Sequence, residues 1–318
     1  MNKVPLVETR NLQKFFKVPN GLLHAVDGVN FIVNEGKTLG VVGESGCGKS
    51  TLGRTVLGLL KPTGGEVLFE GEDVNRYTKS QMKVFRHKAQ IIFQDPNSSI
   101  NPRMTISEII ADPMIVNLMY KTKAECEARI DELMDTVGLA ARLYNAYPHE
   151  LDGGRLQRVG IARALALKPK FIVCDEPVSA LDVSIQAQTL NLLMDLQDQM
   201  GLAYMFITHN LSVVKHLSDE IAVMYLGKCV ELAPTSDLFK NPSHPYTRAL
   251  LSAIPVPNLS MRKKKVQLLR GEITSPINPQ PGCRFAARCE FVTGACSECD
   301  PELIEISSGH CVACILFK

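Results

Sequence analysis

Residues Gly43-Glu44-Ser45-Gly46-Cys47-Gly48-Lys49-Ser50 match the pattern G-x-x-x-x-G-K-S, and this stretch decides the fold of the chain. It follows an apolar strand predicted at Thr38–Val42 and precedes a helix predicted to begin near Ser50, the context that a phosphate-binding loop requires. Its glycines let backbone N–H groups close around phosphate oxygens, and the helix N-terminus adds positive potential. Lys49 is placed to reach the β- and γ-phosphates, and the Ser50 hydroxyl to bind Mg²⁺. The sequence therefore predicts a nucleotide-binding α/β protein.

A second motif, Phe171–Pro177, is an apolar strand that ends in two carboxylates, Asp175 and Glu176. At the strand tip Asp175 would hold Mg²⁺ through water, and Glu176 could polarise an attacking water. A strand followed by an acidic turn is common, so the motif gains its weight from the phosphate-binding loop. Gln94 and His209 also follow predicted strands, and the C-terminal strand ends of a parallel sheet surround the ligand. We therefore expect all four side chains at one site.

The remaining pattern predicts the architecture. Short apolar alternations in residues 1–36 predict a small antiparallel sheet, and a helical period over about 97–168 predicts a helical subdomain. Elsewhere strands alternate with helices, which predicts a mostly parallel sheet covered on both faces. After about residue 233 prolines become frequent, which indicates a domain boundary. We therefore expect a nucleotide-binding domain over 1–235 and a C-terminal extension over 236–318. The cysteine-bearing tail of this extension begins at about 270.

Composition excludes several classes of protein. The chain has 318 residues, of which 45% are hydrophobic and 21% charged, as in an ordinary globular protein and unlike a disordered or collagen-like chain. A formal charge of +2 gives no general basic excess that would point to nucleic acid. No apolar run approaches 18 residues, so we expect no membrane span. The N-terminal residues lack the pattern of a secretory signal, so we expect a reducing compartment.

The order of these motifs resembles that of the ATP-binding subunits of ATP-binding-cassette (ABC) transporters. The resemblance implies a P-loop NTPase (RecA-like) fold with an antiparallel β subdomain and a helical subdomain. It equates Gly43–Thr51 with the Walker A loop, Gln94 with the Q-loop, Phe171–Glu176 with Walker B and His209 with the switch histidine. The ATP-binding residues implied are Phe16, Gly43, Glu44, Ser45, Gly46, Cys47, Gly48, Lys49, Ser50 and Thr51. The resemblance further implies Mg²⁺ ligation by Ser50, Gln94 and Asp175, and catalysis by Glu176, His209 and Gln94.

Phe16 occupies the place where the family stacks an aromatic ring on adenine, and Phe15 is the alternative. A phenylalanine at either position could equally serve packing. The D-loop of the family corresponds to Ser179, Ala180, Leu181 and Asp182.

The signature loop departs from the family pattern Leu-Ser-Gly-Gly-Gln, because the residues here are Leu151, Asp152, Gly153, Gly154 and Arg155. In the family this loop caps the γ-phosphate of nucleotide held by the opposite subunit. Asp152 would place a carboxylate near that phosphate, where two unit charges 4 Å apart repel by about 4 kcal/mol at an effective dielectric of 20. Arg155 could offset part of this. Alternatively, Asp152 turns away and serves as the N-cap of the following helix.

The residues after 235 narrow the resemblance to the oligopeptide/dipeptide permease branch of importers. Similar segments are Asn241–Leu251, Gly271–Ile273 with Ser275–Pro279, and Gly282–Phe285 with Arg288-Cys289. The resemblance therefore covers nearly the whole chain.

Six of the ten cysteines lie in the last 36 residues. In a reducing compartment metal ligation is favoured over disulfides. The pairs Cys296/Cys299 and Cys311/Cys314 would suit a Cys₄ zinc site, whereas a wider set suits an iron–sulfur cluster. The resemblance implies a 4Fe–4S cluster. Ligation of Zn²⁺ is the second alternative, and unligated or disulfide-bonded thiols are the third. Its implied ligands are Cys283, Cys289, Cys296 and Cys314.

The resemblance implies an ATP-hydrolysing subunit of an importer for di- or oligopeptides, peripheral to the cytoplasmic face of the cell membrane. Its implied partners are two transmembrane permease subunits, a second and non-identical ATPase subunit and, indirectly, an extracytoplasmic peptide-binding protein, with no nucleic acid. The alternatives are an importer of another solute such as nickel or sugar, and an ABC ATPase acting on ribosomes or DNA. A P-loop kinase is disfavoured, because Gln94, Glu176 and His209 together indicate water activation.

Overall fold

A computed structural model describes residues 4–254 and 275–317, so Gly271–Ile273 lies outside the described residues. The chain divides into two compact units. The first unit comprises Met1–Val33, Thr38–Asn75 and Phe206–Lys318, and the second comprises Asn34–Lys37 and Arg76–Met205. The helices within residues 4–254 and 275–317 are all too short or too polar to span a lipid bilayer.

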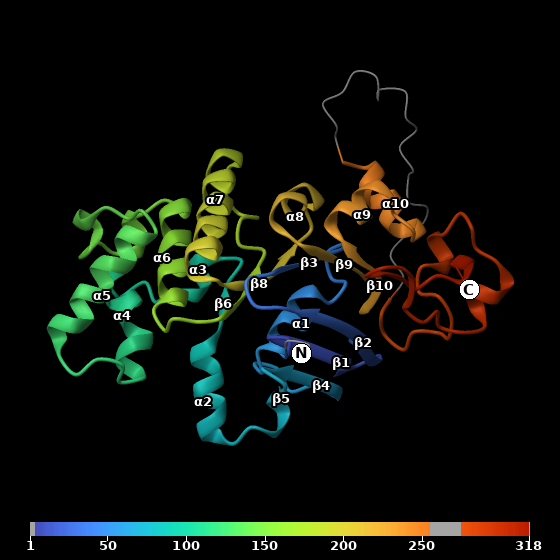
Figure 1. The fold of residues 1–318 in the computed structure, drawn as a ribbon, viewed down its shortest axis with the longest axis horizontal. Helices are drawn as coiled ribbons and strands as arrows, with labels where there is room; N and C mark the ends of the chain where they lie inside the picture. Colours follow the sequence, from blue (N-terminus) through green and yellow to red (C-terminus); the bar gives the residue numbers. More distant parts are fainter. Residues whose placement is uncertain (1–3, 255–274, 318) are drawn as a thin grey trace. The chain divides into compact units, whose positions relative to one another are not determined.

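An antiparallel sheet in the first unit confirms the arrangement predicted for the N-terminal residues (Figure 1). Its strand order is β2-β1-β4-β5, with the bounds Val7–Val18 (β1), Gly21–Val33 (β2), Gly64–Phe69 (β4) and Glu72–Asp73 (β5). Gly64 and Gly65 are the first two residues of β4. Gly65 adopts a φ of +73°, and a Cβ there would lie 2.1 Å from the carbonyl oxygen of Asn11, so no larger residue fits.

The second sheet region of the first unit carries the phosphate-binding loop. Its strands follow the order β11-β12-β10-β9-β3, with β3 and β9 parallel and the remaining pairs antiparallel. The bounds are Thr38–Val42 (β3), Glu220–Tyr225 (β9), Lys228–Pro234 (β10), Ile304–Ser307 (β11) and His310–Val312 (β12). Its helices are Lys49–Val56 (α1), Leu211–Leu217 (α8), Thr235–Lys240 (α9) and Pro245–Ser252 (α10). All five β3 residues are buried, as the sequence predicts for a central strand.

A buried carboxylate fixes the start of the C-terminal extension within the first unit. Glu231, on β10, is fully buried and accepts hydrogen bonds from the backbone N–H groups of Ser243 and His244, at 2.8 and 2.9 Å. His310 on β12 also contacts Glu231, at 2.7 Å from Nε2 to Oε1. These contacts orient α10, whose first turn His244 caps through Nδ1. The domain boundary near residue 235 stays a prediction.

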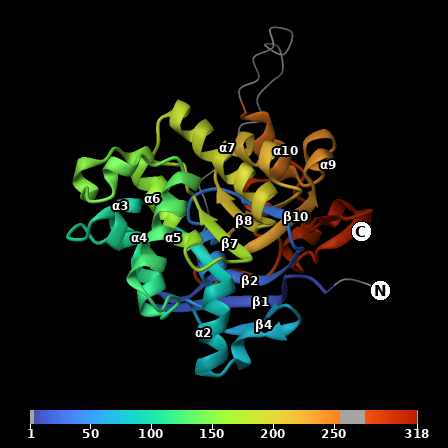
Figure 2. The same cartoon turned by 60° about the vertical axis from the view of Figure 1, so that its left-hand side comes forward.

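The second unit contains the predicted helical region. Its helices are Lys79–Lys88 (α2), Pro96–Ser99 (α3), Ile106–Val116 (α4), Lys123–Thr136 (α5), Gly153–Leu165 (α6) and Val183–Met200 (α7). α4, α5 and α6 lie side by side in both views (Figures 1 and 2). Thr122 and Glu125 form a capping box at the N-terminus of α5. β6 (Ala89–Ile92) and β7 (Phe171–Asp175) are parallel, and β8 (Ala203–Thr208) leads the chain into the first unit.

Candidate functional site

The loop between β3 and α1 has a backbone that only glycine permits at two positions. Gly43 and Gly48 adopt φ angles of +153° and +105°. A Cβ at Gly43 would lie 2.2 Å from the carbonyl oxygen of Met224, and one at Gly48 would lie 1.9 Å from that of Ala25. Both oxygens belong to the backbone and cannot move aside as a flexible side chain would. The loop therefore packs directly against the backbone at Met224 and at Ala25.

Gly48→Ala is expected to destabilise the protein and to remove most nucleotide binding, because its Cβ would displace the backbone at Ala25. Strain at such a position costs about 1–3 kcal/mol before any clash is added. Gly46→Ala is the matched control, because Gly46 also has a positive φ, +78°, but a Cβ there meets nothing within 4 Å. Thermal unfolding and ATP titration should show the larger loss for Gly48→Ala. Equal losses would contradict this explanation.

Lys49 lies beneath this loop and is only 5% exposed. Its Nζ donates hydrogen bonds to the carbonyl oxygens of Gly43 and Glu44, at 2.8 and 2.9 Å. Nζ also lies 3.9 Å from Cys47 Sγ, a weak acceptor. The ammonium group therefore bridges the loop, and its third N–H could exchange the sulfur for a phosphate oxygen. Burial raises the pKa of the neighbouring Cys47 thiol despite the Lys49 charge, so this cysteine stays protonated at neutral pH.

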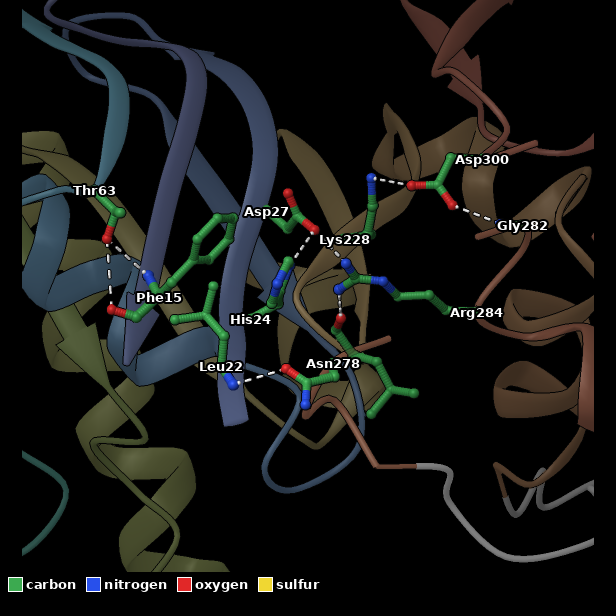
Figure 3. A network of polar contacts seen from close by, with 11 residues as sticks. Phe15, Leu22, His24, Asp27, Thr63, Lys228, Asn278, Gly282, Arg284 and Asp300 are labelled. Atoms are coloured by element: carbon green, nitrogen blue, oxygen red, sulfur yellow. Dashed lines mark hydrogen bonds and ion pairs between the residues drawn. The ribbon is translucent and has the colours of Figure 1, made fainter. Parts of the chain in front are cut away.

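The two aromatic candidates for adenine stacking lie on neighbouring positions of β1. The Phe15 ring stacks on His24 of β2, with centroids 4.0 Å apart and an interplanar angle of 25° (Figure 3). The Phe16 ring has Lys14 Nζ 4.8 Å from its centroid. Phe15 thus has a stacked partner within its own sheet, which favours Phe16 for a ligand ring. The assignment of Phe16 stays a prediction.

Within the second unit, the Q-loop glutamine meets the Walker B carboxylate. Gln94 Nε2 donates to Glu176 Oε2 at 3.2 Å. Glu176 has a φ of +48°, a conformation that costs a non-glycine residue free energy and is concentrated at functional sites. Its carbonyl oxygen accepts hydrogen bonds from the N–H and the hydroxyl of Ser179, at 3.2 and 3.1 Å. Asp175, one residue earlier, is 2% exposed.

The altered signature loop adopts the capping arrangement. Asp152 is the N-cap of α6, and its Oδ1 accepts a hydrogen bond from the backbone N–H of Arg155 at 2.8 Å. Its Oδ2 pairs with Arg155 Nη1 at 2.9 Å. Gly154 packs closely on α7, since a Cβ there would lie 2.6 Å from Ile185 Cγ2. In the D-loop, Asp182 precedes α7 without a side-chain capping bond.

Two side chains of the C-terminal extension hold the phosphate loop. Arg288 Nη1 and Nη2 donate to Glu44 Oε2 and Oε1, at 2.7 and 3.1 Å. The Tyr246 hydroxyl accepts from the backbone N–H of Glu44 at 3.0 Å. In the sequence, Tyr246 and Arg288 belong to the segments that resemble the oligopeptide/dipeptide permease branch. No local pattern predicts that they contact Glu44.

Four cysteines line one pocket in the first unit, together with His244, Phe285 and other side chains. These four are Cys283, Cys289, Cys296 and Cys314. Burial, together with the neighbouring thiols, raises the pKa of Cys283 to about 11. Cys299 and Cys311 do not line this pocket. Among the described residues, no group of three or more histidine, cysteine or acidic side chains is placed so that it could hold a metal ion.

Comparison with known proteins agrees with both halves of this description. Residues 26–179 match the family model of the ABC transporter domain, and residues 230–296 match that of the oligopeptide/dipeptide transporter C-terminal region. The oligopeptide transport ATP-binding protein OppF of Escherichia coli is 50% identical over 309 residues, which cover 97% of this chain and 92% of that protein. The dipeptide transport ATP-binding protein DppF of Haemophilus influenzae is 47% identical, with 98% and 96% covered.

The chain belongs to the oligopeptide/dipeptide branch of the ABC transporter ATP-binding proteins. A solved dimeric ATP-binding cassette in a post-hydrolysis state, bound to ADP and Pi, has a TM-score of 0.66 and 30% identity, and covers 72% of this chain and 98% of that cassette. This similarity confirms the α/β cassette fold predicted from the sequence.

The structure assigns the predicted ABC residues to two groups. The first unit contains Phe16, the Walker A loop and the switch histidine, His209, which is exposed directly after β8. The second unit brings together Gln94, Walker B, the D-loop and the signature loop. Chemically, the first group can bind a polyphosphate and the second can position a carboxylate beside an attacking water. The family membership supports ATP hydrolysis as the reaction.

Proposed function

We propose that this chain is the ATP-hydrolysing subunit of an importer of di- or oligopeptides. The observation that carries the proposal is the contact of Gln94 with Glu176, directly after the buried Asp175, in a chain whose C-terminal region matches the oligopeptide/dipeptide family model. The relatives named above transport oligopeptides or dipeptides, which supports the same cargo class here.

In the proposed reaction the Walker A loop binds ATP, with Phe16 against the adenine and Lys49 at the β- and γ-phosphates. The hydroxyl, amide and carboxylate oxygens of Ser50, Gln94 and Asp175 are ligands of the kind that Mg²⁺ prefers. When bound, Mg²⁺ would neutralise charge on the phosphates. Glu176 accepts a proton from the water that attacks the γ-phosphate, and ADP is the leaving group. His209 contacts the γ-phosphate. Gln94 orients Glu176 through the hydrogen bond that joins them.

The proposed partners are two transmembrane permease subunits and a second, non-identical ATPase subunit, with a peptide-binding protein acting from the outer side. This chain would attach peripherally to the cytoplasmic face of the membrane.

Uptake by the complex reconstituted in liposomes tests the proposal. The full chain, purified with its permease and binding-protein partners, should import members of a panel of labelled di- and oligopeptides when ATP is inside. Import of nickel or a sugar in place of peptides would favour the alternative cargo. ATPase activity that responds to ribosomes or DNA, and not to permease subunits, would contradict a transport role.

We further propose that Cys283, Cys289, Cys296 and Cys314 hold a 4Fe–4S cluster. Their common pocket supports this ligand set over the two C-x-x-C pairs, because Cys299 and Cys311 lie outside it. Thiolates are the ligands that such clusters require, and their spacing varies widely. When bound, the cluster would supply a redox-active or structural group.

Metal analysis of anaerobically purified protein tests this ligand set. We expect a brown protein with broad absorption near ~400 nm and about four irons per chain, because cubane clusters take four thiolates. Cys283→Ser should lower the iron content, whereas Cys299→Ser, the control, should not. Stoichiometric zinc without iron would favour the Cys₄ zinc alternative.

A further inference from the structure

The C-terminal extension holds three atoms of one Walker A residue. Both carboxylate oxygens of Glu44 accept from the Arg288 guanidinium, at 2.7 and 3.1 Å, and the Glu44 N–H donates to Tyr246 Oη at 3.0 Å. Glu44 lies directly before Ser45, and its carbonyl oxygen accepts from Lys49 Nζ. The extension therefore acts on the same residue whose carbonyl group fixes the phosphate-binding lysine.

The two side chains that contact Glu44, Arg288 and Tyr246, are both buried. The Arg288 side chain is 7% exposed, and Tyr246 is fully buried. Arg288 also donates to Tyr225 Oη at 3.4 Å and lies 5.8 Å from the centre of that ring. Two parallel N–H···O bonds to one carboxylate are short, strong and directional, which a lysine could not reproduce. This pair can define the position of the Glu44 carboxylate.

Sequence neighbours of these two residues line the pocket that holds Cys283, Cys289, Cys296 and Cys314. Cys289, the residue after Arg288, lines the pocket, as do His244 and Pro245, the residues before Tyr246. Phe285 lines the pocket as well, and its ring packs against Tyr246 with centroids 5.4 Å apart. The residues next to Arg288 and Tyr246 in the sequence thus belong to the lining of the pocket that holds the four cysteines.

A second arginine of the extension provides a comparison. Arg284 pairs with Asp27 of β2 and donates to the carbonyl oxygen of Leu226, and its side chain is also 7% exposed (Figure 3). Asp27 is 2.9 Å from His24, and although burial opposes its ionisation, His24, Lys228 and Arg284 hold its pKa below the ordinary value. Arg284 thus fixes the same extension to β2 through an ion pair, and its hydrogen bonds among the described residues go to Asp27 and Leu226 and not to the Walker A loop.

We propose that Arg288 and Tyr246 are positioning residues for the Walker A loop, and that the C-terminal extension, by holding Glu44, keeps this loop in the shape that binds a triphosphate. The inference rests on the nucleotide site proposed above and adds the extension to it. The second family-specific region of the chain thereby acts directly on the nucleotide site of its own subunit.

Titration of the full chain with inorganic tripolyphosphate isolates the phosphate-binding step from the adenine contact. Arg288→Ala is expected to weaken tripolyphosphate binding about tenfold, which equals about 1.4 kcal/mol. Tyr246→Phe should weaken it by a smaller factor, because it removes one acceptor of the Glu44 N–H. Arg288→Lys should recover only part of the affinity, since it cannot form the bidentate pair. Arg284→Ala is the matched control. Its affinity for tripolyphosphate should stay within about twofold of the wild-type value, well below the tenfold loss expected for Arg288→Ala.

A double-mutant cycle separates positioning from general destabilisation. Glu44→Gln combined with Arg288→Ala should bind tripolyphosphate no more weakly than either single variant, because both changes remove the same pair. The iron content of Arg288→Ala should match that of the wild type. If Arg288→Ala does not fold, Tyr246→Phe, which removes a single oxygen, provides the test.

The proposal is overturned if Arg288→Ala and Tyr246→Phe bind tripolyphosphate as the wild type does, or if Arg284→Ala weakens binding as much as Arg288→Ala. A wild-type chain that binds neither ATP nor tripolyphosphate would contradict the nucleotide site itself, and the positioning role with it.

Discussion

Glu176→Gln is expected to abolish most ATP turnover by the assembled transporter while leaving ATP binding intact. Removing a general base typically costs about 10²–10⁴-fold in rate. Glutamine keeps an oxygen that can accept the hydrogen bond from Gln94. In the wild type this bond joins Gln94 Nε2 to Glu176 Oε2 at 3.2 Å. It also leaves the backbone unchanged at a residue whose φ is +48°, so the turn to Ser179 should survive. The carboxylate charge is the only function removed.

The measurements are the steady-state ATPase rate of the complex and the dissociation constant for ATP. Glu127→Gln is the matched control, because Glu127 pairs with Lys123 on the exposed face of α5 in the same unit, at 3.4 Å. That variant should keep the wild-type rate. Near-normal turnover by Glu176→Gln would remove Glu176 from the catalytic role, and a large loss of ATP affinity would show that it acts in binding instead.

Local patterns explain which parts of this site were predictable from the sequence. A buried strand, a glycine-rich turn and a lysine at the start of a helix occupy consecutive positions, so β3, the Walker A loop and α1 were foreseen within one residue. The same holds for Walker B, since β7 ends at Asp175 as the apolar run indicated. Backbone preferences and burial act over a few residues here, and the sequence displays them directly.

Contacts between distant segments were not predictable in this way. Glu44 meets Tyr246 and Arg288 across separations of 202 and 244 residues, and nothing in a local pattern encodes such a pair. Their side chains meet because Glu231 orients α10 and the aromatic rings of Tyr225 and Phe285 pack beside them. Only the packed structure reveals that the extension reaches the phosphate loop.

The conformation of the signature loop was only partly predictable from the sequence. The sequence left two alternatives for Asp152, and the structure shows the helix-capping one, with both carboxylate oxygens engaged by Arg155. The Asp152 and Arg155 side chains are 58% and 50% exposed, so the pair remains open to a partner subunit. In this arrangement the positive charge of Arg155 offsets the carboxylate, but the loop lacks the serine hydroxyl of the family pattern.

Unequal nucleotide sites in a heterodimer are the expected consequence of this loop. The residues with which this subunit would bind and hydrolyse its own nucleotide all match the family pattern, among them Lys49, Asp175 and Glu176. Only the loop that it would lend to a partner is altered. In a homodimer both composite sites would combine an intact Walker A loop with an altered signature. In a heterodimer the alteration is confined to one site, and the other pairs this chain's Lys49 and Glu176 with an unaltered signature.

We therefore expect one fast and one slow or silent site in the assembled complex. Glu176→Gln in this subunit should stop hydrolysis, whereas the equivalent change in the partner ATPase should leave most of the turnover. Asp152→Ser combined with Arg155→Gln should raise activity at the slow site, because it restores the serine hydroxyl and the glutamine of the family pattern. ATPase rates of the complex with each variant measure these differences. The idea fails if this subunit alone assembles a fully active dimeric complex, or if the two glutamate changes are equally damaging.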